Sequence, residues 1–174
     1  MRVPRLLLAA LGALAAVPAA AAAAPAPFGV QDDRLTSGPV ESVPERVRLL
    51  AATGTRVTRV DVLWSLLAPR RPARPADPAD PAYDWERLDA VVRGLRERRI
   101  APILAVYSAP PWAAGGRRAP KGSEVNPNAP SPSQFGAVMR ALAVRYSGRH
   151  RPAGAARPLP EVRRWELWTE PNLA

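Results

Sequence analysis

Residues 55–64 read TRVTRVDVLW, a run of β-branched and apolar residues. This composition predicts a strand buried in a parallel sheet or barrel. Three other segments are also strand-like, namely 28–32, 100–107 and 162–169. Apolar residues at helical spacing lie between these segments and predict helices at about 44–53, from Asp84 onward, and at about 133–146. Strands that alternate with helices indicate parallel βα units.

The fold class predicted from this alternation is α/β, with four parallel strands forming the first half of a (β/α)8 barrel. Two Pro-rich loops, 68–82 and 108–132, follow strands, so they are expected at the carboxyl face where such folds build sites. A dinucleotide-binding sheet is the alternative. Residues 33–37 contain no glycine, however, so no Gly-rich turn that could cradle a phosphate follows the first strand.

The first 24 residues have the layout of a secretory signal peptide. Arg2 and Arg5 precede the apolar run Leu6–Val17, and small residues follow at Ala19–Ala24. A membrane anchor is the alternative, but the run is shorter than the ~20 residues that a spanning helix needs. We therefore expect cleavage near Ala22–Ala24, a mature domain at 25–174, secretion, and no membrane association after cleavage. The chain has no cysteine, so no disulfide can support it.

The formal net charge is +10, and Lys121 is the only lysine. An excess of positive charge is also typical of a secreted protein that binds anionic polymers, and this is an alternative function. The arginines, however, are scattered through helices and loops instead of forming one stripe. The sequence therefore predicts solvated arginines and no nucleic-acid partner.

The segment WELWTEPN at 165–172 carries the clearest chemical signal. Pro171 ends the strand and restricts Glu170, which is expected to be held extended at the mouth of the barrel. A fixed carboxylic acid beside a leaving oxygen suits general acid/base catalysis of glycoside cleavage. A solvated loop glutamate is the alternative for Glu170. Glu166 competes for the catalytic role, but its position inside the strand favours an ion pair with an arginine.

This segment resembles the Trp-Asn-Glu-Pro motif at the fourth strand of clan A glycoside hydrolases, nearest to families 5 and 39. Other segments in matching order are Thr58–Asp61 with Trp64, Tyr83–Trp85 with Leu88 and Asp89, and Ala109–Trp112. The resemblance covers residues 28–174. Only the glutamate motif is strongly specific, and the other segments add weight through their order and spacing.

The resemblance implies a retaining hydrolase of β-linked oligo- or polysaccharides, with Glu170 as the general acid/base and Arg59 hydrogen-bonded to the nucleophile. A structural ion pair is the alternative for Arg59. In this clan the nucleophile lies on strand seven, beyond Ala174. We therefore expect a partial sequence that is inactive alone, and no cofactor or metal is implied. The alternative function is a non-catalytic carbohydrate-binding half-barrel.

Five residues are expected to bind the sugar in this interpretation: Trp64, Trp112, Trp168, Thr169 and Asn172. An indole at a strand exit could stack on a sugar ring, although packing of the loops is the alternative. Thr169 stands where the family has asparagine. In the family this asparagine would hydrogen-bond the 2-hydroxyl of the sugar, and threonine is shorter and offers one hydroxyl. His150 is the only histidine, so neither a Ser-His-Asp triad nor a histidine-based metal site can be formed.

Overall fold

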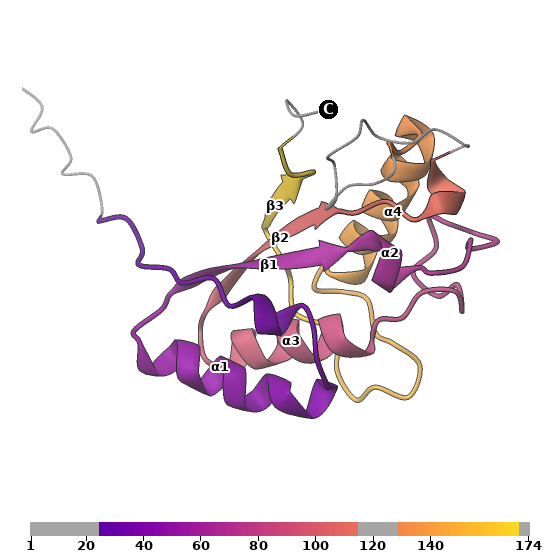
Figure 1. Cartoon of the computed structure of the whole chain (residues 1–174). Helices are drawn as coiled ribbons and strands as arrows, with labels where there is room; N and C mark the ends of the chain where they lie inside the picture. The colour runs from indigo at the N-terminus through magenta and orange to yellow at the C-terminus, as the bar shows by residue number, and fades with distance from the viewer. Residues whose placement is uncertain (1–24, 115–128, 171–174) are drawn as a thin grey trace, which may run out of the picture.

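The computed structural model describes residues 25–114 and 129–170, which form an α/β unit around a parallel sheet (Figure 1). The sheet has the order β1-β2-β3, with β1 at Val57–Leu63, β2 at Ala101–Tyr107 and β3 at Arg164–Leu167. The helices are α1 (Val43–Ala52), α2 (Trp64–Leu67), α3 (Glu86–Glu97) and α4 (Pro132–Arg145). Short 3-10 turns occupy Asp33–Leu35, Val40–Ser42 and Pro111–Ala113. The three longer helices and the three later strands predicted from the sequence are confirmed.

Segment 28–32 differs from its predicted strand, because it makes a single parallel bridge between Gly29 and Val57. Thr58 Oγ1 donates to Val30 O at 2.6 Å, which keeps the segment beside β1 for a short distance. Asp32 then accepts a hydrogen bond from Arg34 N and begins the 3-10 turn that leads the chain away. The sheet of the described residues therefore has three strands, and the four-stranded half-barrel is not confirmed.

The two faces of the sheet differ in polarity because side chains alternate along each strand. Thr58, Val60 and Val62 are buried against the helices, whereas Arg59 and Asp61 point to the opposite face and are half-buried. β1 pairs with β2 from Val57↔Ala101 to Leu63↔Tyr107, so the alternation continues across the strands. The helix-covered face is therefore apolar, and the other face carries the charged residues.

Helix α3 packs on the sheet through Leu88, Val91, Val92 and Leu95, which are all buried. Gly94 faces α1, where an added Cβ would lie 3.3 Å from Val47 Cγ2, so the small residue allows the two helices to approach closely. Arg87, in the first turn of α3, is half-buried. It donates to the carbonyl oxygens of four residues in the turn before α1: Arg34, Leu35, Ser37 and Gly38.

A buried ion pair joins α3 to α4. Arg145 Nε and Nη2 donate to the two oxygens of Asp89 at 2.9 and 2.7 Å, and Tyr146 Oη donates to the same carboxylate at 2.9 Å. The Arg145 guanidinium also lies 4.5 Å from the centre of the Trp85 ring. Trp85 Nε1 donates to Pro78 O at 2.9 Å, which ties the predicted loop 68–82 to the same cluster.

The predicted signal peptide occupies residues 1–24, which lie outside the described residues. In the described ranges, 25–114 and 129–170, no helix is both long and apolar enough to cross a membrane.

Replacing Arg145 by methionine should lower the free energy of unfolding by about 3–5 kcal/mol, because Asp89 would keep a buried charge without its partner. Urea denaturation followed by circular dichroism measures this loss. Arg140→Met is the matched control, since Arg140 is exposed on the same helix and should change stability by less than about 0.5 kcal/mol. Equal losses in the two variants would show that the ion pair contributes nothing specific.

Candidate active site

The charged face of the sheet collects residues from all three strands. Arg59 and Asp61 come from β1, and Glu166 comes from β3. Asp61 and Glu166 are both register partners of Ala105, so the two carboxylates lie on either side of this alanine. The small side chain of Ala105 leaves space above β2 for contacts between β1 and β3.

Arg59 fills this space and holds both carboxylates. Its Nε and Nη2 atoms donate to the two oxygens of Glu166 at 2.8 and 3.1 Å, and its Nη1 atom donates to Asp61. The predicted pairing of Glu166 with an arginine is therefore confirmed. A guanidinium has five N–H donors, and these contacts use three of them. Within the described residues, two N–H groups of Arg59 remain to bind another group at this face.

Tyr107, at the end of β2, completes the face beside Arg59. Its ring centre lies 5.8 Å from the guanidinium carbon, and the side chain is only 7% exposed. Burial, and then the neighbouring Asp61 carboxylate, raise the pKa of Tyr107 to about 12. The hydrogen bond to Glu166 raises the pKa of Arg59. The phenol is therefore neutral and the guanidinium charged across the physiological range.

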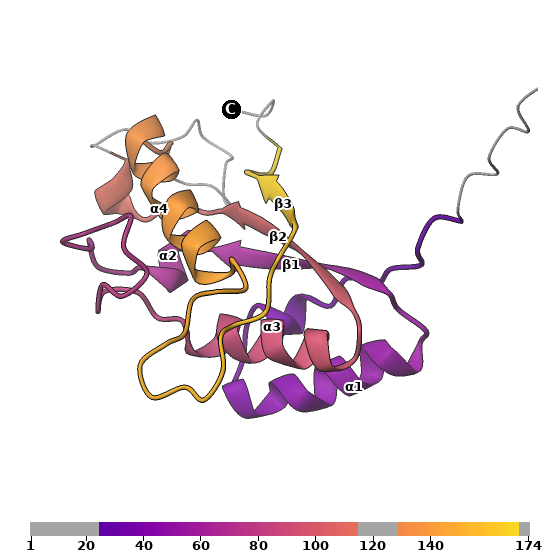
Figure 2. The same cartoon turned by 180° about the vertical axis from the view of Figure 1, so that it is seen from behind.

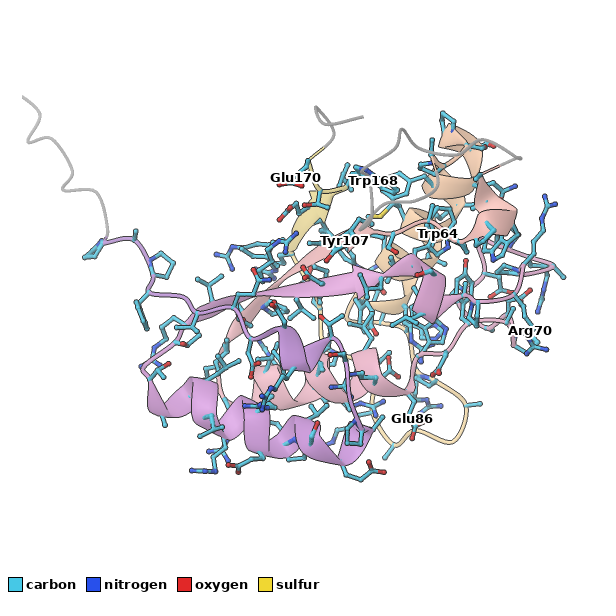
Figure 3. The ribbon with its side chains drawn as sticks, in the orientation of Figure 1. Trp64, Arg70, Glu86, Tyr107, Trp168 and Glu170 are labelled. Atoms are coloured by element: carbon cyan, nitrogen blue, oxygen red, sulfur yellow. The ribbon has the colours of Figure 1, made fainter. Side chains whose placement is uncertain are left out.

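Glu170 lies beyond the carboxyl end of β3, with its side chain exposed (Figure 3). Its φ of 47° differs from the extended conformation predicted for it, and Trp168 also has a positive φ, of 70°. The reason is a change of direction after Leu167, where Trp168 N makes the last bond to β2 by donating to Val106 O at 2.9 Å. Glu170 thus stands at the end of a turn at the mouth of the sheet.

Four aromatic rings pack across the ends of the strands. Trp64 contacts Trp112 edge-on at 5.4 Å and Phe135 at 6.0 Å, and Phe135 contacts Trp168 edge-on at 5.6 Å. Trp64 is fully buried, so neither face of its indole is open to a sugar ring as was expected. The sequence suggested a strand exit at Trp64, but α2 begins there and turns the side chain into the core.

The other expected sugar-binding residues differ in their exposure. Trp112 is half-buried, and its Nε1 atom donates to Ala68 O at 2.9 Å, which places it in loop packing. Trp168 and Thr169 are half-buried beside Glu170, whereas Asn172 lies outside the described residues. The structure therefore brings Trp168, Thr169 and Glu170 together at the end of β3.

Two residues at this face, Asp61 and Tyr107, were not predicted as site residues. Strand alternation could have indicated Asp61, because it lies two positions after Arg59 and so shares its face. Among the residues that the structure describes, no group of three or more His, Cys, Asp or Glu side chains is arranged to hold a metal ion.

No protein-family model matches the chain, and no curated protein matches it in sequence. Solved structures do resemble it. A glucosidase from Croceicoccus marinus matches 85% of this chain with a TM-score of 0.55 and 16% identity, covering 29% of its own chain. A β-galactosidase from the Antarctic haloarchaeon Halorubrum lacusprofundi matches 80% with a TM-score of 0.52 and 19% identity, covering 20% of its own chain.

A family 39 glycoside hydrolase from Bacteroides cellulosilyticus also matches, over 77% of this chain and 23% of its own, with a TM-score of 0.49 and 21% identity. The chain therefore spans less than a third of the length of each of these proteins. At these identities, the similarity to the Croceicoccus and Halorubrum enzymes supports a glycoside hydrolase fold.

The Arg59–Glu166 pair should contribute a coupling free energy of about 0.5–1 kcal/mol, because both side chains are partly exposed and water screens their attraction. A double-mutant cycle of Arg59→Met and Glu166→Gln in urea measures this term. The cycle of Arg59→Met with Glu161→Gln is the control, since Glu161 pairs with Arg163 and should show no coupling. Coupling of equal size in both cycles would contradict the specific pair.

The three tyrosines of the chain should resist ionisation, because the pKa values of Tyr83, Tyr107 and Tyr146 are all raised, mainly by burial. In the unfolded chain they ionise near pH 10. The contribution of these neutral phenols to the stability of the folded protein is therefore complete below about pH 10. It is lost as the pH rises through the pKa values that the tyrosines have in the folded state.

Absorbance at 295 nm during alkaline titration tests this prediction. Tyrosinate should form together with loss of the circular-dichroism signal, and Tyr107→Phe should reduce the final absorbance by one third. Ionisation of a third or more of the tyrosine at pH 10 in the folded protein would contradict the burial of these phenols.

Proposed function

We propose that this chain is part of a secreted retaining glycoside hydrolase that cleaves β-linked oligo- or polysaccharides, with Glu170 as the general acid/base. The observation that carries the proposal is the exposed Glu170 at the carboxyl end of a glycosidase-like parallel sheet, beside a face organised by Arg59. Export after cleavage near Ala24 belongs to the same proposal. The sugar, the linkage and the oligo- or polysaccharide length are set by residues that bind around this mouth.

In the proposed reaction, the protonated carboxyl of Glu170 donates its proton to the glycosidic oxygen as the bond to the sugar breaks. The Glu170 carboxylate then accepts a proton from the water that releases the sugar. Its exposure allows it to reach both the leaving group and the water. We assign the nucleophile to a carboxylate other than Glu166 and Asp61, because these two already pair with Arg59.

Arg59 has a supporting role in this proposal. Its two unused N–H groups can bind and stabilise the ionised nucleophile, while Glu166 and Asp61 fix the orientation of the guanidinium. Trp168, with one edge against Phe135, and Thr169 are proposed to contact the sugar, as is Asn172. Trp64 and Trp112 are left out, because the Trp64 ring is fully buried and the Trp112 N–H donates to Ala68 O within the loop packing.

A non-catalytic carbohydrate-binding protein is the second candidate. The observation in its favour is that Arg59 is already neutralised by two carboxylates of this chain. Such a protein would bind oligosaccharides through Trp168 without cleaving them. The experiment below separates the two functions.

Glu170→Gln, tested in an enzyme that contains this chain, should lower cleavage of natural glycosides by about 10²–10⁴, the usual contribution of a general acid. An aryl glycoside with a good leaving group needs little protonation, so formation of its glycosyl-enzyme intermediate should be much less affected. Azide should then restore the second step, because this small anion attacks without a general base.

Glu166→Gln is the matched control in the same strand. It weakens the contact to Arg59, so it should affect natural and aryl glycosides alike and should show no rescue by azide. If Glu170→Gln behaves in the same way as Glu166→Gln, the assignment of Glu170 is wrong. If the unmodified enzyme binds oligosaccharides but cleaves none, the binding protein is the better interpretation.

A further inference from the structure

A basic groove lies at the amino ends of β2 and β3, at the opposite end of these strands from Glu170. It consists of two adjoining cavities of about 700 and 350 Å³, both lined by Arg96, Glu97 and Pro160. The end of α3 and the start of β2 form one side. The segment that connects α4 to β3 forms the other side and passes over α3 (Figure 2).

Six arginines converge on this groove although they lie far apart in the sequence: Arg93, Arg96, Arg99, Arg157, Arg163 and Arg164. The only acidic side chains among the lining residues of the two cavities are Glu97 and Glu161, so the lining carries a net charge of +4, from six positive and two negative groups. The scattered arginines of the sequence are thus partly gathered in space, contrary to the expectation drawn from their spacing.

Four of these guanidinium groups are free to bind a ligand. Arg163 pairs with Glu161 at 2.7 Å, and Arg93 lies 3.9 Å from Asp89. Within the described residues, the side chains of the other four make no ion pair or hydrogen bond: Arg96, Arg99, Arg157 and Arg164. All four are exposed. No direct ion pair within the described residues therefore offsets their mutual repulsion.

The helix dipole explains only some of this charge. Cations near the carboxyl end of α3 are favourable, which accounts for Arg96. Arg157 and Arg164 belong to another segment and lie outside the last turn of α3, where cations gain most from the dipole. Arg99 has a φ of 58° just after α3, a position that glycine occupies at much lower cost. A strained non-glycine residue that lines a cavity is a sign of function.

We propose that this groove binds a polysaccharide that carries carboxylate or sulfate groups. A guanidinium holds either group through two oxygens, and four unpaired guanidiniums suit a repeating anion. Nucleic acid is the competing polyanion. Single-stranded nucleic acid binds by stacking its bases on aromatic side chains, and none lines either cavity. The groove is separate from the proposed catalytic mouth, so it does not depend on the function of Glu170.

Binding of the chain to polygalacturonate, dextran sulfate, neutral dextran and single-stranded DNA, measured by biolayer interferometry at 50 and 150 mM salt, tests this proposal. At least one anionic polysaccharide should bind more tightly than DNA, and neutral dextran should not bind through the groove. Polygalacturonate identifies a carboxylate ligand, and dextran sulfate identifies a sulfate ligand. Tighter binding to DNA, or no binding to either anionic polysaccharide, would overturn the proposal.

Two triple variants separate the groove from general attraction by a basic protein. One triple variant combines Arg96→Gln, Arg157→Gln and Arg164→Gln. It should bind the anionic polysaccharide about ten-fold more weakly, because it loses three exposed ionic contacts that each contribute little free energy. The control removes the same charge elsewhere, by Arg70→Gln with Arg71→Gln and Arg140→Gln, and should weaken binding less than about three-fold (Figure 3 shows Arg70). Equal losses in the two triples would refute a specific groove.

Arg99→Gly separates binding from folding. Glycine adopts the positive φ without strain, so this variant should melt at the same temperature or higher. It should nevertheless bind the anionic polysaccharide about three-fold more weakly, because one guanidinium is lost. If Arg99→Gly binds the polysaccharide with unchanged affinity, Arg99 is not part of the proposed site. Its strained backbone is then not connected with binding.

Discussion

The charged face of the sheet depends on one guanidinium. Arg59 reaches across Ala105 and binds Glu166, 107 residues later in the chain, while it also binds Asp61 in its own strand. Without this cation, two carboxylates would face each other across an alanine. Because β1 and β3 are held apart by β2, no backbone hydrogen bond can join them, and the side-chain contact is their direct link on this face.

A second arginine–carboxylate pair holds the opposite side of the molecule, and the two pairs differ in burial. The side chains of Arg145 and Asp89 are 7% and 11% exposed, whereas those of Arg59 and Glu166 are 24% and 40% exposed. Loss of one partner in the buried pair leaves a charge that water cannot solvate, so that pair fixes the helices firmly. Water reaches the other pair, so Arg59 can exchange or share partners at small cost. The buried pair is therefore the more costly of the two to break, and the pair near the proposed substrate site is the less costly.

The sequence predicted the parts of this structure that depend on local periodicity. Strands β1 and β2 and helices α1, α3 and α4 follow from their apolar patterns. The strand expected at 28–32 failed because the Asp32 side chain caps a turn there, which composition does not reveal. Trp64 was assigned to the site because it ends a β-like run, but a helix starts at that residue and its side chain is fully buried in the core. The pairing of Glu166 was predictable from its place within a strand. Tyr107 and the gathering of arginines around the groove were not, because both arise from contacts between distant segments.

The charged groups at the two ends of the sheet are opposite in sign. The two ends are far enough apart to act separately. Arginines that have no partner within the described residues collect at the amino ends of β2 and β3, whereas Glu170 lies beyond the carboxyl end of β3. Strand β2 has seven residues, so the two ends are about 20 Å apart at roughly 3.3 Å per residue. The screening length in physiological salt is about 8 Å, less than half that distance. Direct attraction between the groove arginines and Glu170 is therefore largely screened.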